Sequence, residues 1–127
     1  MGTAVERFRR ENSMPKRSDY RTMVYICSAY SGDVVANVEK TKRYCRYAVD
    51  HNYMPIAPHL MYPQFMDETT ERDLAIHMDL VLLGKCEEVW VIGKSVSKGM
   101  AIELEQAQWW GKHIRYFDEE MKEVFHD

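Results

Sequence analysis

The sequence predicts an α/β domain in which a four- or five-stranded, mainly parallel sheet lies between helices, a three-layer fold of the Rossmann or flavodoxin type. Two observations predict it. Short runs rich in β-branched and aromatic residues alternate with stretches that have the spacing of amphipathic helices. A repeated strand and helix order requires right-handed crossovers between parallel strands. The 127 residues suffice for one such domain.

Composition restricts the partners and the compartment. With 17 basic and 20 acidic residues and a formal charge of -3, the chain has no electrostatic footprint for a nucleic-acid polymer. No apolar stretch is long enough to span a bilayer, so no membrane partner is expected. Cys27, Cys45 and Cys86 lack metal-ligand spacing and would leave an odd thiol if two of them paired. We therefore expect a cytoplasmic protein with reduced thiols, no metal site and a small-molecule partner.

The order of the elements follows from the apolar pattern. Residues 1–21 form a polar arm, with a short helix indicated at residues 4–11 but no ordered structure expected overall, and the domain spans residues 22–127. The predicted strands span residues 22–27, 54–57, 88–92 and 113–117. The predicted helices span residues 34–51 and 70–85 and lie within 97–111, and the acidic tail is expected to form a terminal helix or a strand extension. The loop at residues 60–70 is either a substrate lid or a packed surface loop.

Polar residues follow the ends of several predicted strands, which a parallel sheet brings to one edge. Tyr25 and the turn at residues 28–33 belong to the first strand, His59 follows the second, and Ser97 and Lys98 follow the third. Each also has an ordinary structural role: Tyr25 could be a core aromatic residue, and His59 a loop residue that bonds the backbone. The turn has neither the GxGxxG pattern nor the P-loop lysine, so it is a weak signal for phosphate.

Glu103 stands near the start of the helix that follows the third strand. The partial positive charge at a helix N-terminus favours an ionised carboxylate by roughly 0.3–1 kcal/mol at exposed sites. Glu103 is therefore a candidate nucleophile or general base, and the alternative is a solvent-facing residue of an amphipathic helix. Asp73, near the start of the preceding helix, is either a second catalytic acid or an ordinary helix-start charge.

Three motifs carry a resemblance to a known family. They are YICSAYSGD at residues 25–33, ERDLA at residues 71–75, and SKGMAIELEQA followed by GKHI from residue 97 to residue 114. These motifs resemble those of the nucleoside 2-deoxyribosyltransferase superfamily, which includes 2'-deoxynucleoside 5'-phosphate N-hydrolases and CMP N-glycosidases. The chain is also similar to small proteins of bacteria and their phages that carry YICSPYSGD, APHL and SKGM.

The resemblance implies cleavage or transfer at the N-glycosidic bond of a nucleoside or nucleotide, without a metal or an organic cofactor. It implies that Glu103 attacks the anomeric carbon, that Tyr25 orients Glu103, and that Asp73 contacts the sugar or the base. The implied substrate-binding residues are Ser28, Tyr30, Ser31, Gly32, His59, Ser97, Lys98 and Gly99.

The superfamily resemblance also implies a homodimer or a larger homo-oligomer. The apolar surface for such contacts would come from Met61, Tyr62, Phe65, Trp109 and Trp110. The alternative is that both tryptophans pack inside their own subunit.

Departures from the family pattern keep a second class of function open. Ala101 and Glu105 replace glycines of the family pattern on either side of Glu103, and Glu105 adds charge there. The turn at residues 28–33 lacks the arginine of the nucleotide hydrolases, a role that Lys98 or a neighbouring subunit would have to take. The alternative to catalysis is a sensor or sequestering protein that binds a nucleotide or an ADP-ribose-like ligand without cleaving it.

Overall fold

A computed structural model describes residues 2–12 and 20–125. The strands are β1 (Thr22–Cys27), β2 (Tyr53–Ile56), β3 (Glu88–Ile92), β4 (His113–Phe117) and β5 (Glu123–Val124). The helices are α1 (Ala4–Glu11), α2 (Val34–Asp50), α3 (Arg72–Lys85) and α4 (Lys98–Trp109), with the 3₁₀ turns η2 (Pro58–Leu60) and η3 (Tyr62–Gln64). Three strands have their predicted bounds, and β2 begins and ends one residue earlier than predicted.

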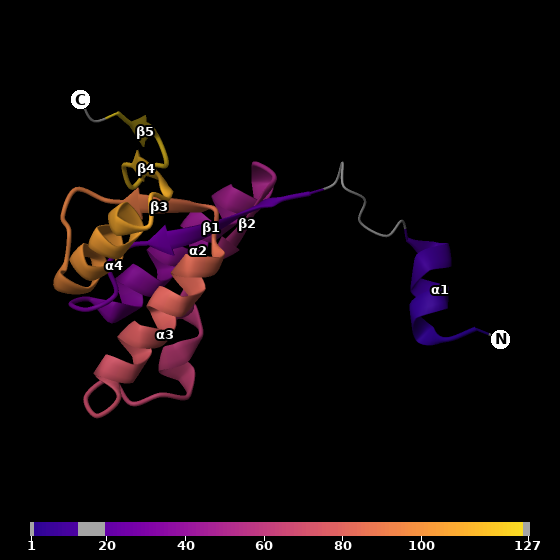
Figure 1. The fold of residues 1–127 in the computed structure, drawn as a ribbon, viewed down its shortest axis with the longest axis horizontal. Helices are drawn as coiled ribbons and strands as arrows, with labels where there is room; N and C mark the ends of the chain where they lie inside the picture. The colour runs from indigo at the N-terminus through magenta and orange to yellow at the C-terminus, as the bar shows by residue number, and fades with distance from the viewer. Residues whose placement is uncertain (1, 13–19, 126–127) are drawn as a thin grey trace.

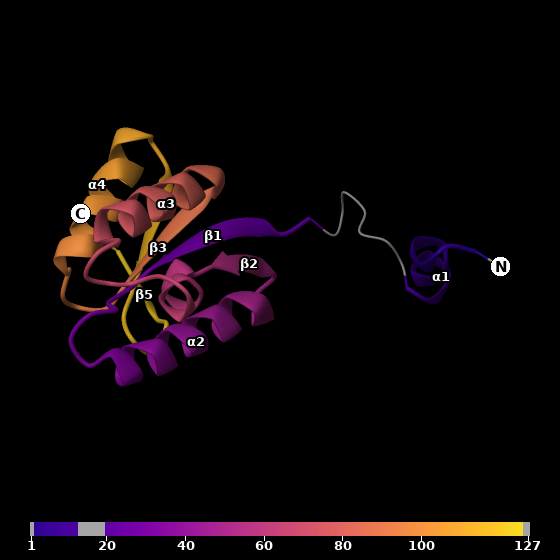
Figure 2. The same ribbon diagram turned by 90° about the horizontal axis from the view of Figure 1, so that it is seen from below.

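The strands form one five-stranded sheet in the order β2-β1-β3-β4-β5. The first four strands of the chain pair in parallel, and β5 runs antiparallel to β4. The predicted mainly parallel sheet is therefore confirmed, and the acidic tail forms a strand extension. As Figures 1 and 2 show, α2 lies on one face of the sheet, and α3 and α4 lie together on the other.

Strand alternation divides the core into two layers. Val24 and Ile26 of β1 pack on the α2 side, whereas Tyr25 and Cys27 pack on the side of α3 and α4. The residues of β3 alternate in the same way. Since β1 and β3 pair at the centre of the sheet, Tyr25 is fully buried at 0% exposure. The sequence of β1 thus places the Tyr25 side chain on the face that also carries α4.

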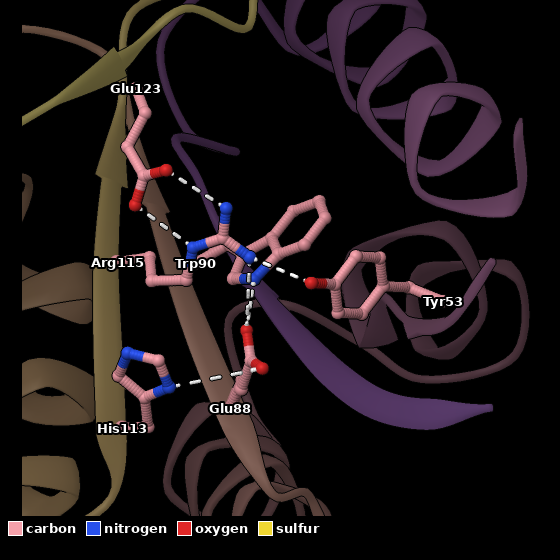
Figure 3. Close-up of polar contacts among 6 residues, drawn as sticks. All are labelled: Tyr53, Glu88, Trp90, His113, Arg115 and Glu123. Atoms are coloured by element: carbon pink, nitrogen blue, oxygen red, sulfur yellow. Dashed lines mark hydrogen bonds and ion pairs between the residues drawn. The ribbon is translucent and has the colours of Figure 1, made fainter. Parts of the chain in front are cut away.

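A network of side chains attaches β5 to the α2 side of the sheet (Figure 3). The Arg115 guanidinium donates two hydrogen bonds of 2.9 Å to the two carboxylate oxygens of Glu123. It also donates to the Tyr53 hydroxyl at 2.9 Å and to Glu88 at 3.4 Å. The same group lies 5.4 Å from the Trp90 ring centroid, within the range of a cation–π contact. This bidentate pair explains how a very short strand stays on the sheet edge.

Candidate active site

A pocket opens at the carboxyl ends of β1 and β2, on the side of the sheet covered by α3 and α4. The residues lining it are Tyr30, Ser31, Pro58, His59, Tyr62, Pro63, Glu68, Arg72, Ala75, Ile76, Asp79, Ser97, Gly99, Met100 and Glu103. In the strand order, the crossovers reverse direction between β1 and β3, and open α/β sheets bind ligands at this point. Residues that follow both of these strands line the pocket. The pocket therefore occupies the position that the fold favours for a ligand.

The enclosed space of this pocket is small. Its volume is about 80 Å³, whereas sites for small molecules usually measure about 300–1,000 Å³. The loop at residues 57–71, which includes both 3₁₀ turns, supplies one wall.

Glu103 projects from α4 and keeps only 3% exposure. Ser97 caps α4 by accepting a hydrogen bond of 3.2 Å from the Met100 N–H, which fixes the helix start beside the pocket. Glu103 lies beyond the first turn of α4, where the helix dipole has little effect. The pKa of Glu103 is raised to about 8. Burial is the main cause, the Tyr25 hydroxyl opposes it, and the charge of Asp79 adds to it. Glu103 is thus buried rather than solvent-facing, and its charged form is disfavoured.

Tyr25 is the neighbour of Glu103 beneath the pocket. Its hydroxyl lowers the pKa of Glu103, and after the effect of burial the charge of Glu103 raises the pKa of Tyr25. Tyr25 Oη and Glu103 Oε2 are nevertheless both buried without a hydrogen-bond partner in good geometry among the described residues. The two groups are therefore close enough to affect each other's pKa, without a hydrogen bond of ordinary geometry between them. Tyr25 itself is not among the residues that line the pocket.

The second buried carboxyl of the pocket belongs to Asp79. The pocket residues of α3 are at positions 72, 75, 76 and 79, the spacing of a single helix face. Asp73 falls outside this face and is exposed. Asp79 keeps 7% exposure, and its pKa is raised to about 7 by burial and then by the charge of Glu68. The sequence contained a signal for Asp79, because the Asp-Leu pair at residues 73–74 is repeated at residues 79–80.

Aromatic rings form the wall that faces the first two strand ends. The rings of Tyr30 and His59 stack with centroids 5.2 Å apart. Asn37 holds the loop after β1 in place by donating hydrogen bonds of 3.0 Å to the carbonyl groups of Tyr30 and Ser31. Burial lowers the pKa of His59, which favours the neutral ring.

The other predicted substrate-binding residues are divided between the pocket and its surroundings. Ser31, Ser97 and Gly99 line the pocket. Ser28 does not: it bonds Thr41 of α2 at 3.0 Å and lines a second cavity on the α2 side. Strand alternation explains this, since Val24 and Ile26 also face α2.

Gly32 and Lys98 line neither of these two cavities. The φ of +98° at Gly32 belongs to the turn into α2, a conformation that favours glycine. Among the described residues, no group of three or more His, Cys, Asp or Glu side chains is placed to hold a metal ion. No helix in the described ranges is long and apolar enough to cross a membrane.

A protein-family sequence pattern matches most of the chain. The sequence pattern of a family described as Domain of unknown function (DUF7768) matches residues 22–117. No curated protein sequence matches the chain.

Solved structures share the fold at low sequence identity. A 2-deoxyribosyltransferase from the psychrotolerant bacterium Bacillus psychrosaccharolyticus, described as a biocatalyst for nucleoside synthesis, superposes with a TM-score of 0.60 and 18% identity, over 83% of this chain and 77% of that one. A 2-deoxyribosyltransferase from Leishmania mexicana gives a TM-score of 0.58 and 16% identity, over 76% of this chain and 64% of that one. The likeness shows that the chain has the α/β fold of these transferases.

Proposed function

We propose that this chain, a member of the DUF7768 family, cleaves the N-glycosidic bond of a nucleoside or nucleotide or transfers its sugar to another base. The chain belongs to that family because the family pattern covers residues 22–117. The observation that carries the proposal is the pair of buried carboxyl groups, Glu103 and Asp79, in one pocket at the strand ends. Substitution at an anomeric carbon commonly uses two carboxyl groups, one as nucleophile and one as proton donor. The fold shared with 2-deoxyribosyltransferases supports the same class of reaction.

The environments of the two carboxyl groups suggest their roles. With pKa values of about 7 and about 8, the pair retains protons near neutral pH. The Tyr25 hydroxyl favours the ionised form of Glu103, and the reaction proceeds from the state of the pair in which Glu103 is ionised and Asp79 carries the proton. A Glu103 oxygen bonds to C1' while the C1'–N bond breaks, and the proton of Asp79 passes to the departing base. Asp79 then accepts a proton from the water that hydrolyses the glycosyl ester, or a second base accepts the sugar.

The direct test is release of free base from a panel of nucleosides and 5'-nucleotides, followed by chromatography. Wild-type protein should release base from at least one member, and Glu103→Gln should not. Absence of release from every member would reject the proposed reaction.

One observation favours a second candidate function, binding without turnover. Because burial raises the pKa of Glu103 to about 8, this carboxyl is mostly protonated at neutral pH and is then a poor nucleophile. A sensor or sequestering protein for a nucleotide or an ADP-ribose-like ligand needs no ionised nucleophile. Such a protein should show a ligand-dependent rise in melting temperature without release of base.

A further inference from the structure

Two buried carboxyl groups of the pocket have no positively charged partner among the residues that the structure describes. Asp79 and Glu103 keep 7% and 3% exposure. Neither takes part in an ion pair among the described residues, and Glu103 Oε2 has no hydrogen-bond partner there. Buried charges in proteins are normally paired or bound to a metal ion, and the described residues form no metal-binding cluster. When these carboxyl groups ionise, a cationic ligand would supply the positive charge that the described residues do not supply.

The remaining lining of the pocket is also poor in positive charge. Glu68 adds a third carboxylate, held in a turn in which Asp67 accepts backbone hydrogen bonds of 2.8 Å and 3.0 Å. The charge of Glu68 reaches Asp79, whose pKa it raises after the effect of burial. Arg72 is the one Arg or Lys in the described lining, and it is exposed. His59 contributes little positive charge, since burial lowers its pKa.

Aromatic rings complete the pocket. Tyr30 and His59 are stacked with centroids 5.2 Å apart, and Tyr62 is part of the same lining. Aromatic faces attract flat cations through the negative potential above the ring. Carboxylates without counter-ions and aromatic walls together form a pocket suited to a planar organic cation.

We infer that the pocket binds an N-glycoside whose flat leaving group carries a positive charge, as in the N-ribosylpyridinium class. This inference rests on the proposed function, because it uses Glu103 as the nucleophile. The inference limits the substrates of this site to N-glycosides with a cationic leaving group.

The chemistry of such a substrate suits two ionised carboxylates. The ring nitrogen bound to C1' is already cationic, so a Glu103 oxygen bonds to C1' and the electron pair of the breaking C1'–N bond neutralises the ring. The base then leaves without taking a proton. Water adds to C1', gives a proton to Asp79, and displaces Glu103 as a carboxylate. No proton donor is needed in the first step.

The test compares two ligands of nearly the same shape and different charge. Nicotinamide riboside is a pyridinium cation, and its dihydro form is neutral. Titration calorimetry with the full chain at about pH 8.5, where both carboxyl groups are mostly ionised, should give about tenfold tighter binding of the cation. The affinity for the cation should fall at about pH 6, where both groups are mostly protonated.

Three variants identify the source of the preference. Asp79→Asn should remove most of the preference for the cation over its neutral dihydro form, and Glu68→Gln should remove part of this preference. Glu105→Gln should leave the preference for the cation unchanged. This variant deletes an exposed carboxylate that lies on the same helix as Glu103 and outside the pocket. Equal affinity of the wild type for the two ligands, or an unchanged preference in a folded Asp79→Asn, would overturn the inference.

Release of nicotinamide separates this inference from the proposed reaction. Preferential binding of the cation without release would support the cation site and count against cleavage. Release of base from neutral nucleosides by a protein without cation preference would support cleavage and overturn the cation site.

Discussion

The charge of Asp79 on α3 reaches Glu103 on α4 and raises the pKa of that carboxyl. Both side chains are buried in one pocket. Burial disfavours the charged form of each, and the charge of one disfavours the charge of the other. Their titrations are therefore coupled, and a partly protonated pair offers a proton donor beside an attacking carboxylate.

The first prediction distinguishes two aspartates of α3. Asp79→Asn should lower kcat for release of base from a neutral nucleoside by about 10²–10⁴-fold, the usual effect of losing a general acid. Asp73→Asn should have little effect, because Asp73 is exposed and outside the pocket lining. Steady-state kinetics of both variants provide the measurement. The reverse result would support the sequence-based interpretation, in which Asp73 contacts the substrate.

Much of the fold could be predicted because its strands are short runs rich in β-branched and aromatic residues bounded by turn residues. β1, β3 and β4 have the predicted bounds for this reason. The geometry of β5 could not be derived in the same way, since a two-residue strand has no periodicity. It depends on the pairing of Arg115 with Glu123, a contact between side chains rather than a local pattern.

The site was harder to predict than the sheet. Residues at strand ends, including Tyr30 and His59, were predictable from the topology alone and do line the pocket. Asp79 was missed because α3 carries two Asp-Leu pairs, and the packing of α3 decides which of them faces the pocket. Ser28 was expected at the substrate, but it continues the alternation that directs Val24 toward α2.

A second prediction concerns stability and pH. The carboxyl pKa values rise from 4.5 to about 8 for Glu103 and from 3.8 to about 7 for Asp79. At pH values between the ordinary and the raised pKa of each group, the folded state binds more protons than the unfolded state. The free energy of unfolding therefore falls as the pH increases through this range. Glu103→Gln and Asp79→Asn should therefore raise the melting temperature at about pH 8.5 and change it little at about pH 4.

Differential scanning calorimetry across this pH range measures the effect. Glu105→Gln removes an exposed carboxylate from the same helix and serves as the control. If the melting temperatures of Glu103→Gln and Asp79→Asn differ from that of the wild type by the same amount at all pH values, the burial of charge is not the cause of the difference.

The third prediction concerns Tyr25 as a positioning residue. The Tyr25 hydroxyl lowers the pKa of Glu103, so Tyr25→Phe should raise that pKa and move the acidic limb of the pH–rate profile to higher pH. Activity near pH 7 should fall more than activity near pH 9. A loss of kcat that is equal at all pH values would indicate a purely structural role.

The fourth prediction concerns assembly, which we propose to be a homodimer or a larger homo-oligomer. Trp109 is 84% exposed, and Ile102 on the same helix is 39% exposed. Large apolar side chains of this kind often lie in subunit contacts. Light scattering should show an oligomer at micromolar concentration, and Trp109→Glu should shift it toward the monomer. The matched control is Val35→Glu, at a residue of α2 that is 77% exposed. A monomeric wild type would contradict the proposal.

The last prediction concerns the nucleophile itself. Glu103→Gln keeps the size and hydrogen-bonding capacity of the buried side chain and removes the attacking carboxylate. Turnover should therefore collapse while the affinity for a neutral nucleoside changes little. A 2-fluoro-2-deoxyribosyl substrate should trap the glycosyl ester, because fluorine destabilises the oxocarbenium-like transition state and slows hydrolysis. Intact-mass analysis should then show the adduct on wild type and on Glu105→Gln but not on Glu103→Gln. Base release by Glu103→Gln at the wild-type rate would show that another group performs the attack.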